Sequence, residues 1–174
     1  MPHFLQHFLK LCFIVATSTI LFSCAGYQLG GSKPEQLKGI QSIYVPMVEN
    51  KTQEIKLAPQ ATNSLVHFIN KDGAYSVTTP AQSDATLRVV IEKIEYREFR
   101  SARLDTLRAE ELTANIRAKW ELIDNQSNIL LSGRSSGETR FFVGDNQRLS
   151  RDNSLNDALD TLSRKITSLI SNGF

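Results

Sequence analysis

The chain has 174 residues, 41% of them hydrophobic and 22% charged, a balance that predicts one globular domain plus a short additional segment. The formal net charge is +2, and Lys10 is the only Lys or Arg before residue 24, so the remainder is near neutral. A nucleic-acid binder carries a larger basic excess, so we expect no nucleic-acid partner, and any anion recognition must come from a local cluster.

Residues 1–23 predict a signal peptide. Residues 11–22 form an uncharged apolar run, which has the length of a signal-peptide core and is short of the roughly 20 residues that a membrane-spanning helix needs. The sequence Leu21-Phe22-Ser23-Cys24 that ends it resembles the bacterial lipobox. An ordinary cleavage site beside a chance cysteine is the alternative.

Cys24 favours lipidation over that alternative. Once residues 1–23 are removed it is the only cysteine, so no intramolecular disulfide can use it. We expect a diacylglycerol and an N-acyl chain on Cys24, and no other cofactor. Ala25 stands where an Asp would resemble an inner-membrane retention signal, so the expected location is the periplasmic side of the outer membrane. Several acyl chains together anchor a protein firmly.

The glycine-containing residues 24–39 predict a tether, and residues 40–174 a single periplasmic domain. A strand over residues 40–48 comes first. A helix follows from Pro59, with apolar residues at the helical period and an end at Asp72-Gly73. Residues 75–79 predict a short strand. A strand, a helix and a strand at this spacing predict a parallel crossover.

Three longer strands follow. Residues 86–99 change phase near Glu92-Lys93, which indicates a bulge. Residues 110–124 alternate between apolar and polar side chains, which is typical of a sheet with one buried face. The polar residues 125–128 predict a tight turn into residues 129–142 and therefore an antiparallel hairpin.

The last predicted element is an amphipathic helix. Ser154 and Asp157 resemble a capping box at its start. One apolar stripe follows: Leu155, Ala158, Leu159, Leu162, Ile166, Leu169 and Ile170. A helix lying on a membrane surface is the alternative, but its polar face should be strongly basic, which this one is not. We therefore predict an α+β fold, a two-layer sandwich with two helices on one face of a mixed, largely antiparallel sheet.

Candidate catalytic residues are few after residue 23. His67 lies just off the apolar face of the first helix, and no nucleophile is positioned beside it by the sequence. Glu110 and Glu111 are adjacent on a strand and should point to opposite faces. Cys24 is taken up by lipid, so no zinc cluster is expected. We expect no enzyme and no metal site.

One cluster has the chemistry of a binding site. Arg97, Arg100, Arg103 and Arg108 lie within twelve residues, interleaved with Phe99, Leu104 and Leu107. Guanidinium groups bind phosphate oxygens in bidentate fashion, and the apolar neighbours could contact acyl chains. A solvated loop paired with Glu98 and Asp105 is the alternative, and both interpretations stay open.

Short motifs along the chain resemble the lipopolysaccharide-assembly lipoprotein family LptE. They are Cys24-Ala25-Gly26-Tyr27-Gln28-Leu29, the segment from Ile43 to Thr52 with its Pro46 and Asn50-Lys51-Thr52, the strand opening at Ala85-Thr86-Leu87, and Phe141-Phe142. Ala25 departs from the family's usual Gly. The resemblance implies a non-catalytic lipoprotein that sits in the lumen of the outer-membrane barrel LptD, assists its assembly and binds lipopolysaccharide during transport to the cell surface. The four arginines are then candidates for contacts with lipid A phosphates.

A second family remains as the alternative. Pro46 and the Asn50-Lys51-Thr52 segment also resemble periplasmic lipoproteins of the TolB-N-like type, which include activators of peptidoglycan synthesis. A barrel-bound protein should copurify with a large β-barrel, and an activator with a murein polymerase.

Overall fold

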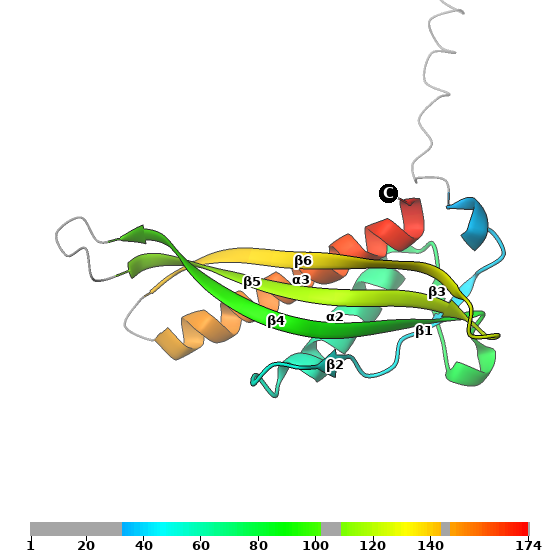
Figure 1. Cartoon of the computed structure of the whole chain (residues 1–174), viewed down its shortest axis with the longest axis horizontal. Coiled ribbons are helices and arrows are strands. Elements are labelled where there is room, and N and C mark those ends of the chain that lie inside the picture. Colours follow the sequence, from blue (N-terminus) through cyan, green and yellow to red (C-terminus); the bar gives the residue numbers. More distant parts are fainter. Residues whose placement is uncertain (1–32, 102–108, 144–146, 174) are drawn as a thin grey trace, which may run out of the picture. The chain divides into compact units, whose positions relative to one another are not determined.

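The structure, a computed structural model, describes residues 33–101, 109–143 and 147–173, and gives no side chains for residues 100, 101, 109 and 110. Its elements in chain order are η1 (Glu35–Leu37), β1 (Ser42–Tyr44), β2 (Glu49–Asn50), α2 (Leu57–Asp72), β3 (Ser76–Val77), η2 (Pro80–Gln82), β4 (Ala85–Ser101), β5 (Ala109–Asp124), β6 (Ile129–Phe142) and α3 (Gln147–Asn172) (Figure 1).

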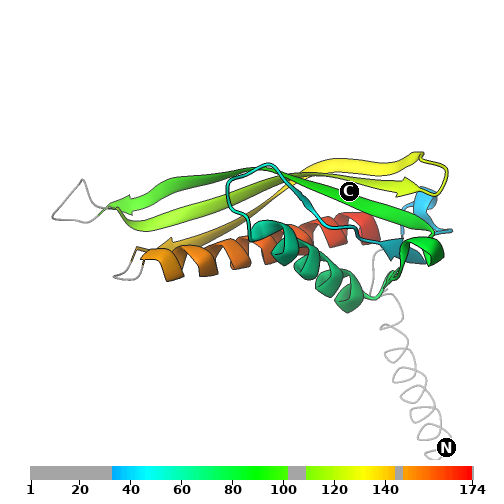
Figure 2. The ribbon, with the colours of Figure 1, turned by 90° about the horizontal axis from the view of Figure 1, so that it is seen from below.

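The strands form one mixed sheet in the order β3-β1-β4-β5-β6, and β2 pairs with β4 further along that strand. The β1–β3, β1–β4 and β2–β4 pairs are parallel, whereas the β4–β5 and β5–β6 pairs are antiparallel. Both helices lie on the same side of the sheet (Figure 2). The predicted α+β sandwich is therefore confirmed. We call the sheet face without helices the open face.

The predicted crossover is confirmed as well. Helix α2 connects the parallel strands β1 and β3. Gly73 ends the helix in the left-handed conformation, with φ of 77°, and donates its N–H to the Ile69 carbonyl at 3.2 Å. A residue with a Cβ is strained at such a φ, which explains why glycine stands here.

The single strand expected over residues 40–48 was wrong. Strand β1 ends at Tyr44, and pairing resumes only at β2. Pro46 has no N–H to give to a neighbouring strand. The N–H of Val48 points away from β4 and bonds to Thr62 Oγ1 on α2 at 2.9 Å. The chain therefore leaves the sheet edge between Tyr44 and Glu49.

Residues that precede the expected start of the domain at residue 40 also pack on it. A compact unit spans Ser32–Phe174, and Leu37 on η1 is fully buried in the core. An isolated apolar side chain in a polar stretch gives no periodic pattern, so the sequence did not reveal that η1 packs on the domain.

The long hairpins follow the predicted pattern. The β4–β5 register shifts between Ile91 and Lys93, where the bulge was expected. In the turn between β5 and β6, Asp124 Oδ1 accepts the N–H groups of Gln126 and Asn128, both at 2.8 Å. Ser127 takes a φ of 68° in this turn.

The core lies between the sheet and the two helices. Trp120 is its largest fully buried side chain, and its indole N–H donates to Ser135 Oγ at 3.0 Å. Gly137 on β6 leaves the room that α3 occupies, because a Cβ there would lie 2.6 Å from the backbone nitrogen of Leu162. Neither helix in the described part of the chain combines the length and apolar character that a membrane crossing requires.

The predicted start of α3 was wrong. Ser154 is not a cap but is buried inside the helix, and its hydroxyl donates to the Arg151 carbonyl at 2.7 Å. The helix begins at Gln147, about two turns earlier. Those two turns carry mostly polar and charged residues, so the apolar stripe that marks the rest of the helix is missing there.

Candidate functional site

The candidate site is the end of the sheet that carries the predicted arginine cluster. We call residues 94–101 of β4, 109–116 of β5 and 137–142 of β6 the distal ribbon. These strand ends extend together past the start of α2 and beside the start of α3 (Figures 1 and 2). Of the seven large apolar side chains that the described residues expose, Tyr96, Phe99 and Phe142 belong to this ribbon.

Register places Arg97 and Arg140 on the open face. Arg97 pairs with Thr113, and Thr113 pairs with Arg140 on the next strand. Side chains of cross-strand neighbours lie on the same face of a sheet. Arg140 stacks on Phe99, with its guanidinium carbon 3.9 Å from the ring centroid. Phe142 on β6 is 69% exposed. It pairs with Glu111 on β5, two residues beyond the Arg140–Thr113 pair.

One carboxylate is surrounded by three cations in this region. Glu95 lies 2.7 Å from Lys93 Nζ, 2.9 Å from Arg117 and 3.1 Å from Arg97. The hydrogen bond from Lys93, helped by the neighbouring positive charges, lowers the pKa of Glu95 below its ordinary value. Glu95 is therefore ionised at neutral pH, and the three cations around it exceed its charge by two. Arg140 and Glu138, which accepts a hydrogen bond from Asn115 at 3.2 Å, add one charge of each sign to the same face.

The structure describes only part of the predicted arginine set. Arg97 is on the ribbon and forms an ion pair with Glu95, and Asp105 lies outside the described residues. Arg100 lies on β4 opposite Glu111, and its side chain is outside the described residues. Arg103, Arg108 and Cys24 also lie outside them.

Sequence reasoning missed Arg140 and the cationic neighbours Lys93 and Arg117. Each stands alone in an alternating strand, so no local cluster marks it in the sequence. The strand pairing brings them beside Arg97. The pattern of polar residues on one face of each strand was the available signal, but it does not give the register between strands.

Arg151 joins the ribbon to the helical layer. Its Nε donates to the Tyr96 hydroxyl at 2.9 Å, and its terminal nitrogen pairs with Glu54. Its guanidinium also lies 5.0 Å from the Tyr96 ring centroid. Burial raises the pKa of Tyr96 above its ordinary value, although the bond from Arg151 opposes this. Tyr96 in turn meets Phe141 edge-to-face, at 6.3 Å between centroids.

A wide hollow of ≈ 600 Å³ opens beside Arg151. It is lined by Gln53, Glu54, Ile55, Lys56, Gln147, Arg148, Arg151 and Asp152. Ile55 is 89% exposed at its rim. The hollow thus places cations next to exposed apolar surface, as the distal ribbon also does.

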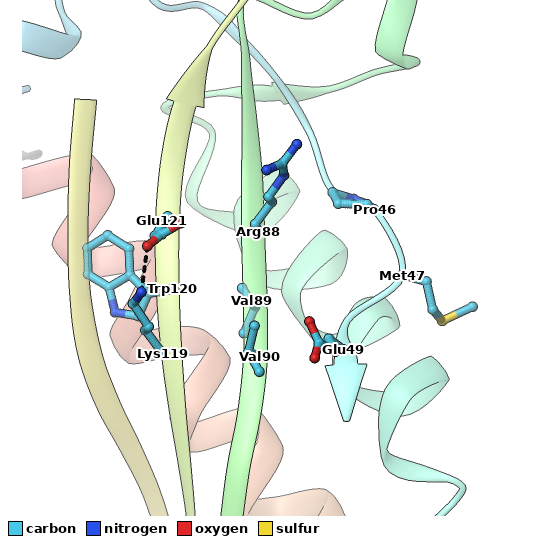
Figure 3. Close-up of a pocket in the computed structure, with 9 residues that line it drawn as sticks. All are labelled: Pro46, Met47, Glu49, Arg88, Val89, Val90, Lys119, Trp120 and Glu121. Atoms are coloured by element: carbon cyan, nitrogen blue, oxygen red, sulfur yellow. Dashed lines mark ion pairs between the residues drawn. The ribbon is translucent and has the colours of Figure 1, made fainter. Parts of the chain in front are cut away.

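A second hollow, of ≈ 380 Å³, occupies the place where the chain leaves the sheet edge at Pro46. It is lined by Pro46, Met47, Glu49, Arg88, Val89, Val90, Lys119, Trp120 and Glu121 (Figure 3). Glu121 is already paired with Lys119 at 2.7 Å. Arg88 extends toward the segment that carries Pro46 (Figure 3). Its two cations, Arg88 and Lys119, are matched by the carboxylates of Glu49 and Glu121, so the lining of this hollow carries no net charge.

The described residues offer little catalytic chemistry. No group of three or more His, Cys, Asp and Glu side chains that could hold a metal occurs among them. His67 is exposed on α2 and meets the Phe68 ring edge-to-face, at 5.2 Å between centroids. Glu111 is buried, and the side chain of Glu110 is outside the described residues, so their geometry as a pair is undescribed.

A comparison with protein families identifies the chain. The family model LptE, described as lipopolysaccharide-assembly, matches residues 40–172, which is nearly the whole folded domain. This chain belongs to the LptE family. Family membership makes it a lipopolysaccharide-assembly component and supports the resemblance seen in the short sequence motifs. No curated protein matches the chain.

Solved structures share the fold of this LptE-family protein. A dodecameric PelC from Paraburkholderia phytofirmans is 14% identical over 81% of this chain and 94% of its own, with a TM-score of 0.52. A Xanthomonas campestris protein is 11% identical over 81% and 86%, with a TM-score of 0.53. A minor lipoprotein from Acinetobacter baumannii is 10% identical over 75% and 90%, with a TM-score of 0.51. At such identities the likeness concerns the fold alone.

Proposed function

We propose that this protein is an outer-membrane lipoprotein, acylated at Cys24, that binds lipopolysaccharide and occupies and helps assemble an LptD-type β-barrel without catalysing a reaction. Family membership over residues 40–172 supports the role in lipopolysaccharide assembly. The observation that carries the binding step is a cluster of cations, Arg97 and Arg140 on the distal ribbon with the neighbouring Lys93 and Arg117, beside exposed aromatic rings.

The chemistry of the ribbon matches that of lipid A. Lipid A joins phosphates to acyl chains, and the ribbon joins Arg97 and Arg140 to Phe99 and Phe142. Guanidinium groups bind phosphate oxygens with two parallel hydrogen bonds. Arg97 is 66% exposed, so its contact with a phosphate gains strength only when the bound lipid excludes water.

The test reverses the charges that the structure describes. The double variant Arg97→Glu, Arg140→Glu should bind lipopolysaccharide at least about tenfold more weakly, because like charges replace charge-assisted contacts. Adding Arg100→Glu, Arg103→Glu and Arg108→Glu should weaken binding further. Wild-type binding should also fall as salt rises, because exposed charges are screened beyond about 10 Å at 0.1 M. Binding of the lipidated protein is measured in detergent over a range of salt concentrations.

The control removes equal charge elsewhere. The variant Lys38→Glu, Lys165→Glu changes the net charge by the same amount on η1 and α3, and should bind normally. If the ribbon variant binds lipopolysaccharide normally but no longer joins the barrel, the arginines form a protein interface. If neither property changes, the ribbon is a solvated surface and the binding proposal is wrong.

A further inference from the structure

A groove between α2 and α3, remote in sequence from the distal ribbon, has features of its own. A hollow of ≈ 230 Å³ lies there, lined by Phe68, Lys71, Asp72, Arg164, Thr167 and Ser168. The two helices are joined on either side of it. Ser64 Oγ donates to Asp160 Oδ1, and Ser171 Oγ donates to Asp72 Oδ2, both at 2.7 Å.

The groove carries positive charge that the described residues do not neutralise. Within them, neither Lys71 nor Arg164 forms an ion pair, and the neighbouring Lys165 is exposed without one as well. Asp72, which accepts a hydrogen bond from Ser171, also lines the groove and offsets one of its two positive charges. Arg164 stacks on Phe68, 5.2 Å from the ring centroid. An anion entering the groove would therefore meet two cations over an apolar floor.

An unsatisfied hydroxyl lines the same hollow. Thr167 is 3% exposed, and its Oγ1 has no hydrogen-bond partner among the described residues. Buried polar groups in folded proteins are nearly always bonded. This hydroxyl is shielded from solvent, so it lies beneath the groove and is not a contact on its surface.

The groove adjoins the point where the chain enters the domain. Lys33 Nζ lies 4.2 Å from the ring centroid of Tyr75 and donates to the Ile40 carbonyl at 3.0 Å. The Tyr75 hydroxyl donates at 2.7 Å to the carbonyl of Ile170, which precedes Ser171. Lys33 is nine positions after Cys24 in the sequence, and a fully extended chain over that distance spans at most about 30 Å.

We propose that this groove lies against the membrane that holds the Cys24 anchor, and that Lys71 and Arg164 bind the phosphates of anionic phospholipid headgroups. The inference rests on the anchoring under the proposed function and adds a surface distinct from the distal ribbon. A tether of about 30 Å keeps the groove near the headgroups at high effective concentration, so individually weak contacts suffice.

The experiment uses the full lipidated protein, with the acylation of Cys24 first verified by mass. It is reconstituted into vesicles of phosphatidylcholine alone or with phosphatidylglycerol, and labelled with a water-soluble amine reagent. Lys119 on the open face is the internal reference. The labelling of Lys71 relative to Lys119 should fall at least about threefold in the anionic vesicles and recover at high salt, because headgroup attraction is screened.

Two variants separate a local site from general attraction. Arg164→Gln should weaken the protection of Lys71, whereas Arg88→Gln removes one charge from the open face and should leave it intact. Equal labelling of Lys71 in both vesicles overturns the inference, as does an equal loss of protection in the two variants. These vesicles hold no lipopolysaccharide and no barrel, so either result leaves the binding role of the ribbon untouched. An unacylated Cys24 overturns the proposed anchor and this inference with it.

Discussion

The absence of a Cβ at Gly137 allows the helical layer to pack closely on the sheet. This residue lies on β6, where α3 crosses the strand, and an added Cβ would lie 2.6 Å from the Leu162 nitrogen and 2.8 Å from its Cβ. These are atoms of a helix that cannot rotate away. The close approach of helix and strand therefore depends on glycine at this position.

Gly137→Ala should destabilise the protein by about 3 kcal/mol or more, because the helix must move as a body to admit one methyl group. Gly39→Ala is the matched control, since an added Cβ there meets nothing within 4 Å. It should change the free energy of unfolding by less than about 1 kcal/mol. Denaturant unfolding of both variants measures the difference. Equal stability would mean that α3 does not pack on β6 as described.

Tyr75 links stability to alkaline pH. Burial, together with the charge of Asp72, raises the pKa of Tyr75 from 10.0 to about 12. The folded state thus favours the neutral phenol, and the stability this contributes is complete below pH 10 and lost as pH rises toward 12.

Tyr75→Phe removes both the titration and the hydrogen bond to the Ile170 carbonyl. At neutral pH we expect a loss of about 1 kcal/mol. Between pH 10 and 12 the variant should lose less stability than the wild type, so that the two unfolding curves converge. Chemical denaturation across this range provides the measurement. Parallel losses in both proteins would contradict a protected phenol.

Individual residues also show where sequence alone fails. Arg97 was found because it sits in a local run of arginines, whereas Arg140 is 43 positions away and becomes its neighbour only through Thr113. Arg151 was missed because the capping pattern at Ser154 placed the start of the helix after it. Contacts that depend on strand register or on a helix end cannot be found from spacing along the chain.

Among the elements, those with a strong period were predicted best. The alternation in β5 predicted Leu112, Ala114, Ile116, Ala118, Trp120 and Leu122 on one buried face, and all of these are buried except Leu112, which is half-buried. Thr113 and Glu111 depart from it, since they are polar-face residues that are nevertheless buried, on the ribbon where Phe142 and Arg140 pair beside them. Short elements such as η1 and β2 have too few residues for a period. Their positions are set by tertiary contacts.

Helix α3 contributes the largest apolar stripe to the core. Leu162→Asp places a charge at a side chain that is 2% exposed, and desolvating that charge should cost several kcal/mol and unfold or nearly unfold the domain. Asn156→Asp adds the same charge on the exposed side of the same helix and should be nearly neutral. Thermal melting of the two variants checks this. An unchanged melting temperature for Leu162→Asp would show that the stripe faces solvent or membrane.

At the scale of the whole molecule, the net charge is near zero, yet cations gather on two separate surfaces. At the distal ribbon, Lys93, Arg97 and Arg117 surround the carboxylate of Glu95, and the helix groove presents Lys71 and Arg164. Composition could exclude a generally basic protein, but only the fold shows where cations gather. The proposed function assigns the first surface to lipopolysaccharide and the barrel, and the groove is inferred to contact phospholipid.

The most direct test of the central claim is purification of the tagged, lipidated protein from detergent-solubilised membranes, followed by identification of its partner by mass spectrometry. The account predicts a large outer-membrane β-barrel of the LptD type, with lipopolysaccharide in the complex. Recovery of a murein polymerase instead, without a barrel, would contradict it and favour the role in peptidoglycan synthesis.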